Sequence, residues 1–346
     1  MPLAADRTIR TSAALAALVL VLAALYATAS VTAPVAFALV VVALAWPLQA
    51  TLERVLPKAL ALLATLAVCI AVAVLLVGSI AWGLARAADW LVANLDRFQL
   101  LYDRAGGWLE QHGLYSRGLL RESADPGRLL ALAGELGGRL RDLASFTVVT
   151  LVFVALGLLE VEPASRRLAR LERRELGALL LRGSAVLAAK LRRYMLVRTL
   201  VSALTGLAVG GFAALLGLEL APVWGVMAFT LNYLPFIGPL IATVLPTALA
   251  IVQFQDLGTV LLVLLGLNLV QVLLGSVLEP RLAGSQLGLS PFLVLLAVFF
   301  WALVWGLPGA FIGVPILIAI ATFAAEYRPA RWLAGLLGSE PAEPVP

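Results

Sequence analysis

Cysteine, histidine and lysine are nearly absent from this chain, and each scarcity excludes a kind of chemistry. Cys69 is the only cysteine and His112 the only histidine. An intrachain disulfide is therefore impossible, and paired-histidine zinc sites and histidine-dependent triads are excluded. The two lysines, Lys58 and Lys190, follow no glycine-rich loop, so the chain has no phosphate cradle for ATP. We expect no catalytic residue, no metal site and no cofactor.

Charged residues are also scarce, because they make up 13% of the 346 residues while hydrophobic residues make up 62%. The mean hydropathy of +1.02 lies outside the range of a soluble domain. We predict an all-α integral membrane protein, because a membrane barrel would show short alternating strands. One helical crossing takes about 20 apolar residues. About eight transmembrane stretches meet that length, at 12–29, 34–50, 59–84, 144–159, 199–218, 221–252, 257–278 and 290–325.

The first stretch has two interpretations. Arg7 and Arg10 precede an apolar run that ends near "ATA", which is typical of a cleaved signal peptide. A second apolar run begins at Pro34, and the two runs also fit a helical hairpin closed at Ala29 to Ala33. We expect the hairpin.

Basic residues predict the topology, because they concentrate on the cytoplasmic side of a membrane. Residues 160–198 carry ten basic residues against four acidic ones, whereas residues 85–143 carry eight of each sign. We therefore expect 160–198 and both termini in the cytoplasm and 85–143 outside. The chain is expected to be a multi-pass protein of a cell membrane.

These patterns divide the chain into five segments. The division is a three-span scaffold at 1–84, an extracytoplasmic amphipathic helical segment at 85–143, a fourth span with a basic cytoplasmic amphipathic helix at 144–198, a transport core at 199–325 and a cytoplasmic tail at 326–346. The outer segment fits either a helical cap on the membrane face or a contact between subunits. The basic helix is expected to face anionic lipid headgroups, so membrane lipid is one predicted partner.

Two stretches, 221–252 and 290–325, are too long for a simple crossing. As straight helices they would measure about 48 Å and about 54 Å, against a hydrocarbon core of about 30 Å. Both contain several prolines and glycines, which break helices at membrane depth. We predict that both are broken or re-entrant, and that they behave alike if the C-terminus is cytoplasmic. Shared "VWG" and "FIG" triplets further suggest a degenerate internal repeat.

Paired broken segments in a transporter are the best pointer to its binding site, although two structural kinks without a ligand would give the same pattern. The predicted substrate or ion pathway comprises Asn232, Tyr233, Pro235, Gly238, Pro239, Asn268, Gln271, Gly313 and Pro315. Interhelical hydrogen bonds explain the polar members equally well. Glu279, Pro280 and Arg281 form either a gate or coupling element or a structural ion pair. Gly206 and Gly210 predict close helix packing.

The order of these elements resembles that of the AI-2E family of bacterial transporters. The likeness rests on "LNYLPFIGPLIATVLP" at 231–246, followed by "VLEPRLAGSQLGLSPFLVLLAVFFWALVWGLPGAFIGVPILI", with "YMLVRTLVSALTGL" before them. It implies eight membrane stretches, a homo-oligomer and export of small solutes such as autoinducer-2, while some members resemble sodium or lithium/proton antiporters. The family's I-P-x-I-G element falls on Asn232, Pro235, Gly238 and Pro239, with Leu234 in place of the commoner isoleucine, and its E-P-R-x-x-G element falls on Glu279, Pro280, Arg281 and Gly284.

The sequence thus predicts a secondary transporter of a small molecule or ion that works by alternating access around the two broken segments. It is not expected to be an enzyme or to bind nucleic acid. A sodium or lithium/proton antiporter is one alternative. A membrane scaffold or regulatory protein that transports nothing is another.

Overall fold

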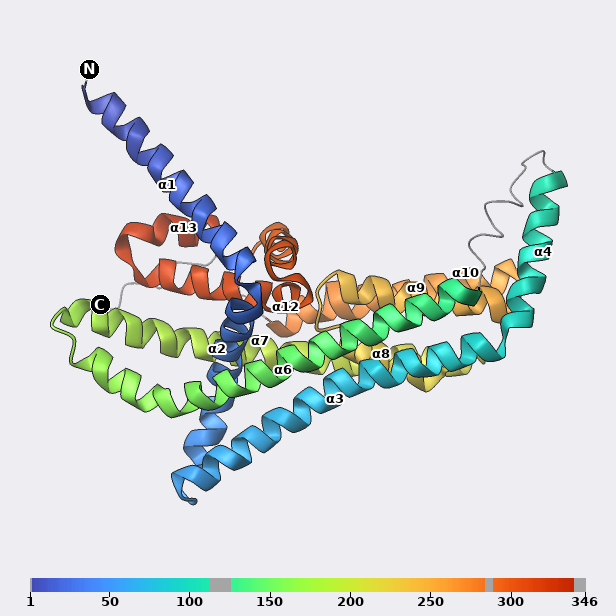
Figure 1. Cartoon of the computed structure of the whole chain (residues 1–346), viewed down its shortest axis with the longest axis horizontal. Coiled ribbons are helices and arrows are strands. Elements are labelled where there is room, and N and C mark those ends of the chain that lie inside the picture. The colour runs from blue at the N-terminus through green and yellow to red at the C-terminus, as the bar shows by residue number, and fades with distance from the viewer. Residues whose placement is uncertain (1, 112–125, 284–288, 339–346) are drawn as a thin grey trace. The chain divides into compact units, whose positions relative to one another are not determined.

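The computed structural model describes residues 2–111, 126–283 and 289–338, and all regular structure in these ranges is helical. Figure 1 follows the helices along the chain. The elements are α1 Pro2–Ala27, α2 Ala29–Leu52, α3 Lys58–Ala93, α4 Leu95–Gln111, α6 Pro126–Ala169, α7 Arg174–Leu215, α8 Ala221–Leu231, α9 Ile237–Phe254, α10 Leu257–Gln271, the π-helix η1 Val272–Leu278, α11 Glu279–Ala283, α12 Pro291–Glu326, the 3₁₀ helix η2 Arg328–Ala330 and α13 Arg331–Leu336. The predicted all-α fold is confirmed.

Seven apolar helices of the described part are long enough to cross a membrane. They are Ala29–Leu52, Lys58–Ala93, Arg141–Ala169, Arg174–Leu215, Ile237–Phe254, Leu257–Leu282 and Pro291–Glu326. Two further apolar segments, Leu15–Ala27 and Ala221–Leu231, are shorter. The chain is therefore a multi-span membrane protein, and the exact number of crossings stays a prediction. The basic stretch expected before the fifth span is divided: Arg166 and Arg167 lie in the last turn of α6, and the part from Arg174 is continuous with the fifth span in α7.

The N-terminal hairpin loop predicted at Ala29 to Ala33 is wrong. These residues form the first turn of α2, and Thr28 alone separates it from α1. The Thr28 N–H donates to Ala24 O, and the Thr32 N–H donates to Thr28 O, both at 2.9 Å. The Thr28 hydroxyl also donates to Ala24 O. Side chains and backbone together keep the helical bonding, so no loop opens.

The chain forms two compact units. The first comprises residues 1–66, 149–192 and 286–346, and the second comprises 67–148 and 193–285. Their boundaries fall inside α3, α6 and α7. These boundaries differ from those of the five sequence-derived segments, whose roles stay predictions. Each unit is described by itself below.

The first long stretch forms a helical hairpin in the second unit. Helix α8 ends at Leu231, five residues follow, and α9 begins at Ile237. The two helices run back along each other, because the Gln253 side chain near the end of α9 bonds the Glu219 N–H at 2.8 Å and the Gly217 carbonyl at 2.7 Å just before α8. Trp224 and Met227 of α8 share a core with residues of α9 and α10.

The second long stretch also folds back on itself, in the first unit. Within α12, Gly306 has φ 66° and ψ −144°, which interrupts the helix. Gly313 lies so close to the first half that an added Cβ would stand 2.9 Å from Ala297 O. In a straight helix these two residues would be about 24 Å apart. Leu317 and Ala321 accordingly pack in one cluster with Leu293 and other residues of the first half.

The two breaks do not occupy equivalent places in the shared triplets. "VWG" lies inside α8, seven residues before its break, whereas the second "VWG" ends on the break at Gly306. The better correspondence is between Gly238 and Gly309. An added Cβ at either glycine would lie 1.9 Å from a carbonyl of the preceding half-helix, Leu231 O or Trp301 O. The helices are thus broken at both predicted stretches, and their re-entry into the membrane stays a prediction.

Candidate functional site

The break between α8 and α9, residues 232–236, is a short non-helical segment within the second unit. Pro235 has no N–H to donate, and the residue before a proline avoids helical geometry. Phe236 adopts φ 64° and ψ −51°, a conformation rarely populated by a residue with a side chain. Such strain costs about 1–3 kcal/mol and concentrates at functional sites. The proline and the strained residue therefore end α8 and set where α9 begins.

Asn232 and Tyr233, at the start of the break, are held by a polar face of α7. The Asn232 Nδ2 atom donates to the Ser202 hydroxyl at 3.1 Å, and Asn232 and Ser202 are only 4% and 0% exposed. The Tyr233 hydroxyl bonds the Thr199 hydroxyl at 2.9 Å. Neutral amide and hydroxyl groups thus meet beside non-helical backbone, with the Asn232–Ser202 bond buried and the Tyr233–Thr199 bond exposed.

Pro235, Gly238 and Pro239 shape the backbone of this site. Pro235 and Gly238 are buried and Pro239 is half-buried. A Cβ at Gly238 would stand 1.9 Å from Leu231 O, so only glycine fits there without moving the chain. The family's glycine at this position is therefore explained by the close return of α9 onto the end of α8.

Within the predicted gate or ion-pair element Glu279-Pro280-Arg281, Glu279 forms no ion pair with Arg281 in the described part of the chain. Glu279 instead pairs with Arg198 of α7, whose Nη1 lies 2.7 Å from each of the two carboxylate oxygens. The side chains of Arg198 and Glu279 are 6% and 23% exposed. Glu279 and Arg281 are two residues apart in helix α11, and residues at that spacing do not face each other. Arg281 and Pro280 are exposed. A gate or coupling role for Glu279 stays a prediction.

Asn268 and Gln271 lie away from this polar cluster along α10. Asn268 is exposed, and its Nδ2 donates to Leu264 O of its own helix at 2.8 Å. Gln271 is the last residue before the π-helix η1, and its Nε2 is buried with no hydrogen-bond partner in the described part of the chain. π-helical turns often mark functional positions. The substrate role predicted for both residues stays a prediction.

Gly313 and Pro315 are buried in the second half of α12. They belong to the first unit, whereas Asn232 and its partners belong to the second. Asn232 and Tyr233 therefore lie together with α7. Gly313 lies at the contact between the two halves of α12.

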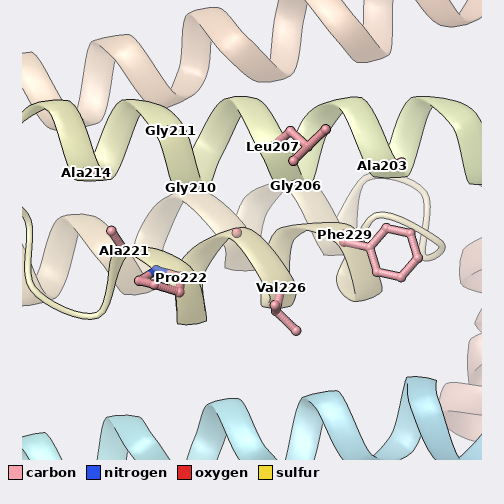
Figure 2. A pocket seen from close by; sticks show the side chains of 11 residues that line it. Ala203, Gly206, Leu207, Gly210, Gly211, Ala214, Ala221, Pro222, Val226 and Phe229 are labelled. Carbon is pink, nitrogen blue, oxygen red and sulfur yellow. The ribbon is translucent and has the colours of Figure 1, made fainter.

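Small residues let α7 and α8 approach closely next to the break, as predicted for Gly206 and Gly210. An added Cβ on Gly206 would lie 2.7 Å from Gly225 O, and one on Gly210 would lie 3.2 Å from Gly225 Cα. Figure 2 shows the helices side by side with an apolar cavity of about 560 Å³ along them. Ala203 and Phe229 line one end of this cavity. Ala203 directly follows Ser202 in sequence, and Phe229 precedes Tyr233 by one helical turn.

Arg198, Thr199 and Ser202 of α7 were missed as site residues from the sequence. Arg198 had been counted among the cytoplasmic charges. A detectable signal exists: Arg198, Ser202 and Thr205 recur at spacings of four and three in an otherwise apolar run, which places them on one helix face.

The chemistry available here is hydrogen bonding by neutral groups next to one charge pair. Among the described residues no group of three or more His, Cys, Asp or Glu side chains could hold a metal ion. Asn232 has both an amide donor and a carbonyl acceptor, and each hydroxyl can donate and accept. The cluster is suited to bind a polar solute reversibly.

The sequence matches a known protein family. The family model described as AI-2E family transporter matches residues 15–329. The AI-2 transport protein TqsA of Escherichia coli (strain K12) is 33% identical over 196 residues, which are 57% of this chain and 56% of TqsA. A provisionally assigned transport protein of Borreliella burgdorferi is 36% identical over 129 residues, 37% of this chain and 36% of that protein. The provisionally assigned transport protein YhhT of Escherichia coli (strain K12) is 33% identical over 145 residues, 42% of this chain and 41% of YhhT. The alignments thus cover little more than half of these relatives at most.

Proposed function

The chain belongs to the AI-2E transporter family, and from that premise we propose that it is a secondary transporter that binds a small solute or ion at the break between α8 and α9. The observation that carries this proposal is the buried Asn232 amide, bonded to Ser202 beside non-helical backbone. Irregular backbone at membrane depth is tolerated where it is buried in protein or lines a watery cavity. A break that is held by polar side chains suits a binding site better than a simple kink.

Binding would exchange hydrogen bonds within the protein for hydrogen bonds to the solute. The Asn232–Ser202 and Tyr233–Thr199 bonds join neutral groups. Replacing one such bond by another changes the free energy little, whereas leaving a buried polar group without any partner costs about 1–3 kcal/mol. The site therefore discriminates by the pattern of donors and acceptors and still releases its solute.

We place the gate at Arg198 and Glu279. This pair ties α7 to α11, and Arg193 adds a bond from Nη2 to Leu282 O at 3.1 Å. A solute that displaces Ser202 acts on α7 one turn from Arg198. Alternating access would then require the α7–α11 contact to loosen and re-form, with the 199–325 core moving around its broken segments.

A sodium or lithium/proton antiporter is the second candidate, and Glu279 is the residue that favours it. Its carboxylate is mostly buried, and its charge is balanced by Arg198. Acidic side chains within membrane-spanning segments often mark ion and proton pathways. A non-transporting scaffold would give the buried Arg198–Glu279 pair no role in ion exchange. It would also not explain why polar side chains hold the break between α8 and α9.

Transport in proteoliposomes tests the proposal. The purified chain is reconstituted and the vesicles are loaded with autoinducer-2, sodium or lithium in turn. We expect gradient-dependent flux of at least one of them. Inserted, monodisperse protein that moves none of the three would contradict transport of these substrates.

Matched variants then locate the site. Asn232→Ala, Ser202→Ala and Thr199→Val should each reduce flux about fivefold, because each removes one hydrogen bond of about 1 kcal/mol. Thr205→Val is the control, because its hydroxyl bonds Val201 O of the same helix at 2.8 Å. Equal effects of Thr205→Val and Ser202→Ala would argue against a site at the break.

We further propose a homo-oligomer in the bacterial inner membrane with both termini in the cytoplasm. The family resemblance supports the oligomer, and the ten basic residues of 160–198 support the orientation. Native mass spectrometry of the full chain counts the subunits. Protease protection of a C-terminal tag in inside-out vesicles tests the orientation.

A further inference from the structure

A basic pocket lies at the C-terminal end of α6, in the first unit. Pro163, Arg166, Arg167 and Arg170 line a cavity of about 340 Å³ in the first unit. The three arginines are exposed. Nothing in the transport proposal uses this cluster.

The four residues lie on one face of the helix, since positions i, i+3, i+4 and i+7 are neighbours on a helical surface. The same face continues towards the N-terminus of α6 through exposed apolar side chains. Val152, Leu156 and Leu159 are 54%, 57% and 56% exposed. An exposed apolar stripe on a membrane-length helix is the surface that contacts lipid tails, and here it ends at the basic pocket.

The charge of the pocket is only partly neutralised within the protein. Glu160 pairs with Arg167 at 2.6 Å. The neighbouring Glu162 is held by Lys58 at 2.9 Å. Among the described residues neither Arg166 nor Arg170 forms an ion pair within 4 Å, although Arg166 interacts with the Glu162 carboxylate at longer range. Both guanidinium groups therefore keep hydrogen-bond donors that can contact an external anion.

The spacing between the apolar stripe and the pocket along α6 fits the distance from lipid tails to a lipid phosphate. Arg166 is seven residues beyond Leu159, about 10 Å along the helix, and the interfacial layer is about 5–8 Å thick on each side of the hydrocarbon core. Side chains on a helix lean towards its N-terminus. The arginines of α6 therefore reach back towards Leu159 and the membrane, which brings their charged ends to the headgroup layer.

We propose that Arg166 and Arg170, with Arg167 and Pro163, bind the phosphate group of an anionic phospholipid whose acyl chains lie on the Val152–Leu159 stripe. Guanidinium groups bind phosphate through paired, charge-assisted hydrogen bonds. The adjoining lipid-facing stripe favours a lipid over a soluble phosphate, because a soluble ion gains nothing from it. The site would anchor the α6 end of the first unit to one lipid class.

Native mass spectrometry of the full chain in detergent tests this site. The protein is titrated with phosphatidylglycerol, with phosphatidylcholine and with glycerol 3-phosphate. We expect phosphatidylglycerol to bind at least tenfold more tightly than either of the other two. The double variant Arg166→Gln/Arg170→Gln should lose that preference. Arg173→Gln/Arg174→Gln is the control, because it removes the same charge from two exposed arginines outside the pocket.

Three results would overturn the proposal. Equal loss of the phosphatidylglycerol preference in both double variants would show that the lipid is attracted to basic charge in general. No loss of that preference in either double variant would show that the lipid binds elsewhere. Glycerol 3-phosphate binding as tightly as phosphatidylglycerol would show a soluble-phosphate site. If the double variant does not fold, the single variants Arg166→Gln and Arg170→Gln should each lose a smaller part of the preference, and unchanged binding in both would count against the site.

Discussion

Arg198 donates from one guanidinium nitrogen to both carboxylate oxygens of Glu279, at 2.7 Å each, and so joins α7 to α11 across 81 residues of sequence. Its Nε is also buried, with no hydrogen-bond partner in the described part of the chain. A buried charge is tolerated when its counter-charge is present and becomes costly when that partner is removed. The pair therefore makes the position of α7 depend on Glu279.

Removing one partner of this pair should destabilise the protein more than removing both. Arg198→Leu leaves the Glu279 carboxylate without its partner, and we expect a loss of about 3 kcal/mol in unfolding free energy. Arg198→Leu/Glu279→Leu should recover part of that loss. Urea unfolding of the detergent-solubilised chain gives both values. If the losses in unfolding free energy from the two single variants add up in the double variant, the two charges do not depend on each other. Arg193→Gln serves as the control, because Arg193 is exposed and its hydrogen bond goes to a carbonyl.

The contact between α7 and α8 should tolerate no side chain at Gly206. A methyl group there would lie 2.7 Å from Gly225 O, which is backbone and cannot rotate away. We expect Gly206→Ala to cost about 1–3 kcal/mol in unfolding free energy. Gly211→Ala on the same helix meets nothing within 4 Å and should be neutral or stabilising, since alanine favours a helix by about 1 kcal/mol over glycine. Similar melting temperatures for the two variants would contradict this packing.

The broken helices could be predicted because their causes are local. Length against bilayer thickness, Pro235 and the glycines all act within a few residues, and the breaks were found inside both predicted stretches. The exact hinge in the second stretch was not evident from the sequence, because Gly306 is one of three glycines there. Its positive φ depends on the second half packing on the first.

The partners of the polar residues could not be predicted, because they come from distant segments. Glu279 lies two residues from Arg281 in sequence, yet its partner is Arg198. The helical spacing of Ser202 with Arg198 marks a polar face, but its partner Asn232 lies 30 residues away in sequence. The N-terminal loop failed for a different, local reason: the Thr28 N–H bonds Ala24 O and the Thr32 N–H bonds Thr28 O, so helical bonding continues across the predicted loop.

The N-terminus of α10 should respond to acid through Asp256. Its carboxylate accepts the Thr259 N–H and the Thr259 hydroxyl, both at 2.8 Å. The backbone hydrogen bond from Thr259, then its hydroxyl bond, hold the pKa of the Asp256 carboxyl below its usual value. A lowered folded-state pKa stabilises the helix end above the unfolded value of about 3.9, and this contribution is lost as the pH falls through the folded value.

Amide exchange at Thr259 measures this effect. Asp256→Ala should speed exchange relative to the wild type at neutral pH, and the difference should vanish as the pH falls through the lowered folded-state pKa. Asp256→Ser keeps a capping oxygen that does not titrate in this range, so its protection relative to Asp256→Ala should not depend on pH. A wild-type advantage that persists well below the lowered pKa would show that the charge is not responsible.

The reversal of α12 at Gly306 gives the most direct test of the fold. Phe292 and Ile320 are exposed and stand fourteen residues on either side of Gly306. In a straight helix they would be about 42 Å apart, whereas a folded-back α12 brings them close together. Spin labels at Phe292→Cys and Ile320→Cys, in a Cys69→Ala background, should therefore report a distance below about 25 Å.

Gly306→Ala should broaden or lengthen that distance, because alanine is strained by about 1–3 kcal/mol at such backbone angles. Gly335→Ala is the control, since that glycine has nothing within 4 Å and no unusual φ. A distance near 40 Å in the wild type would mean that α12 crosses as one extended helix, and the explanation of Gly313 as the contact between its halves would fall with it.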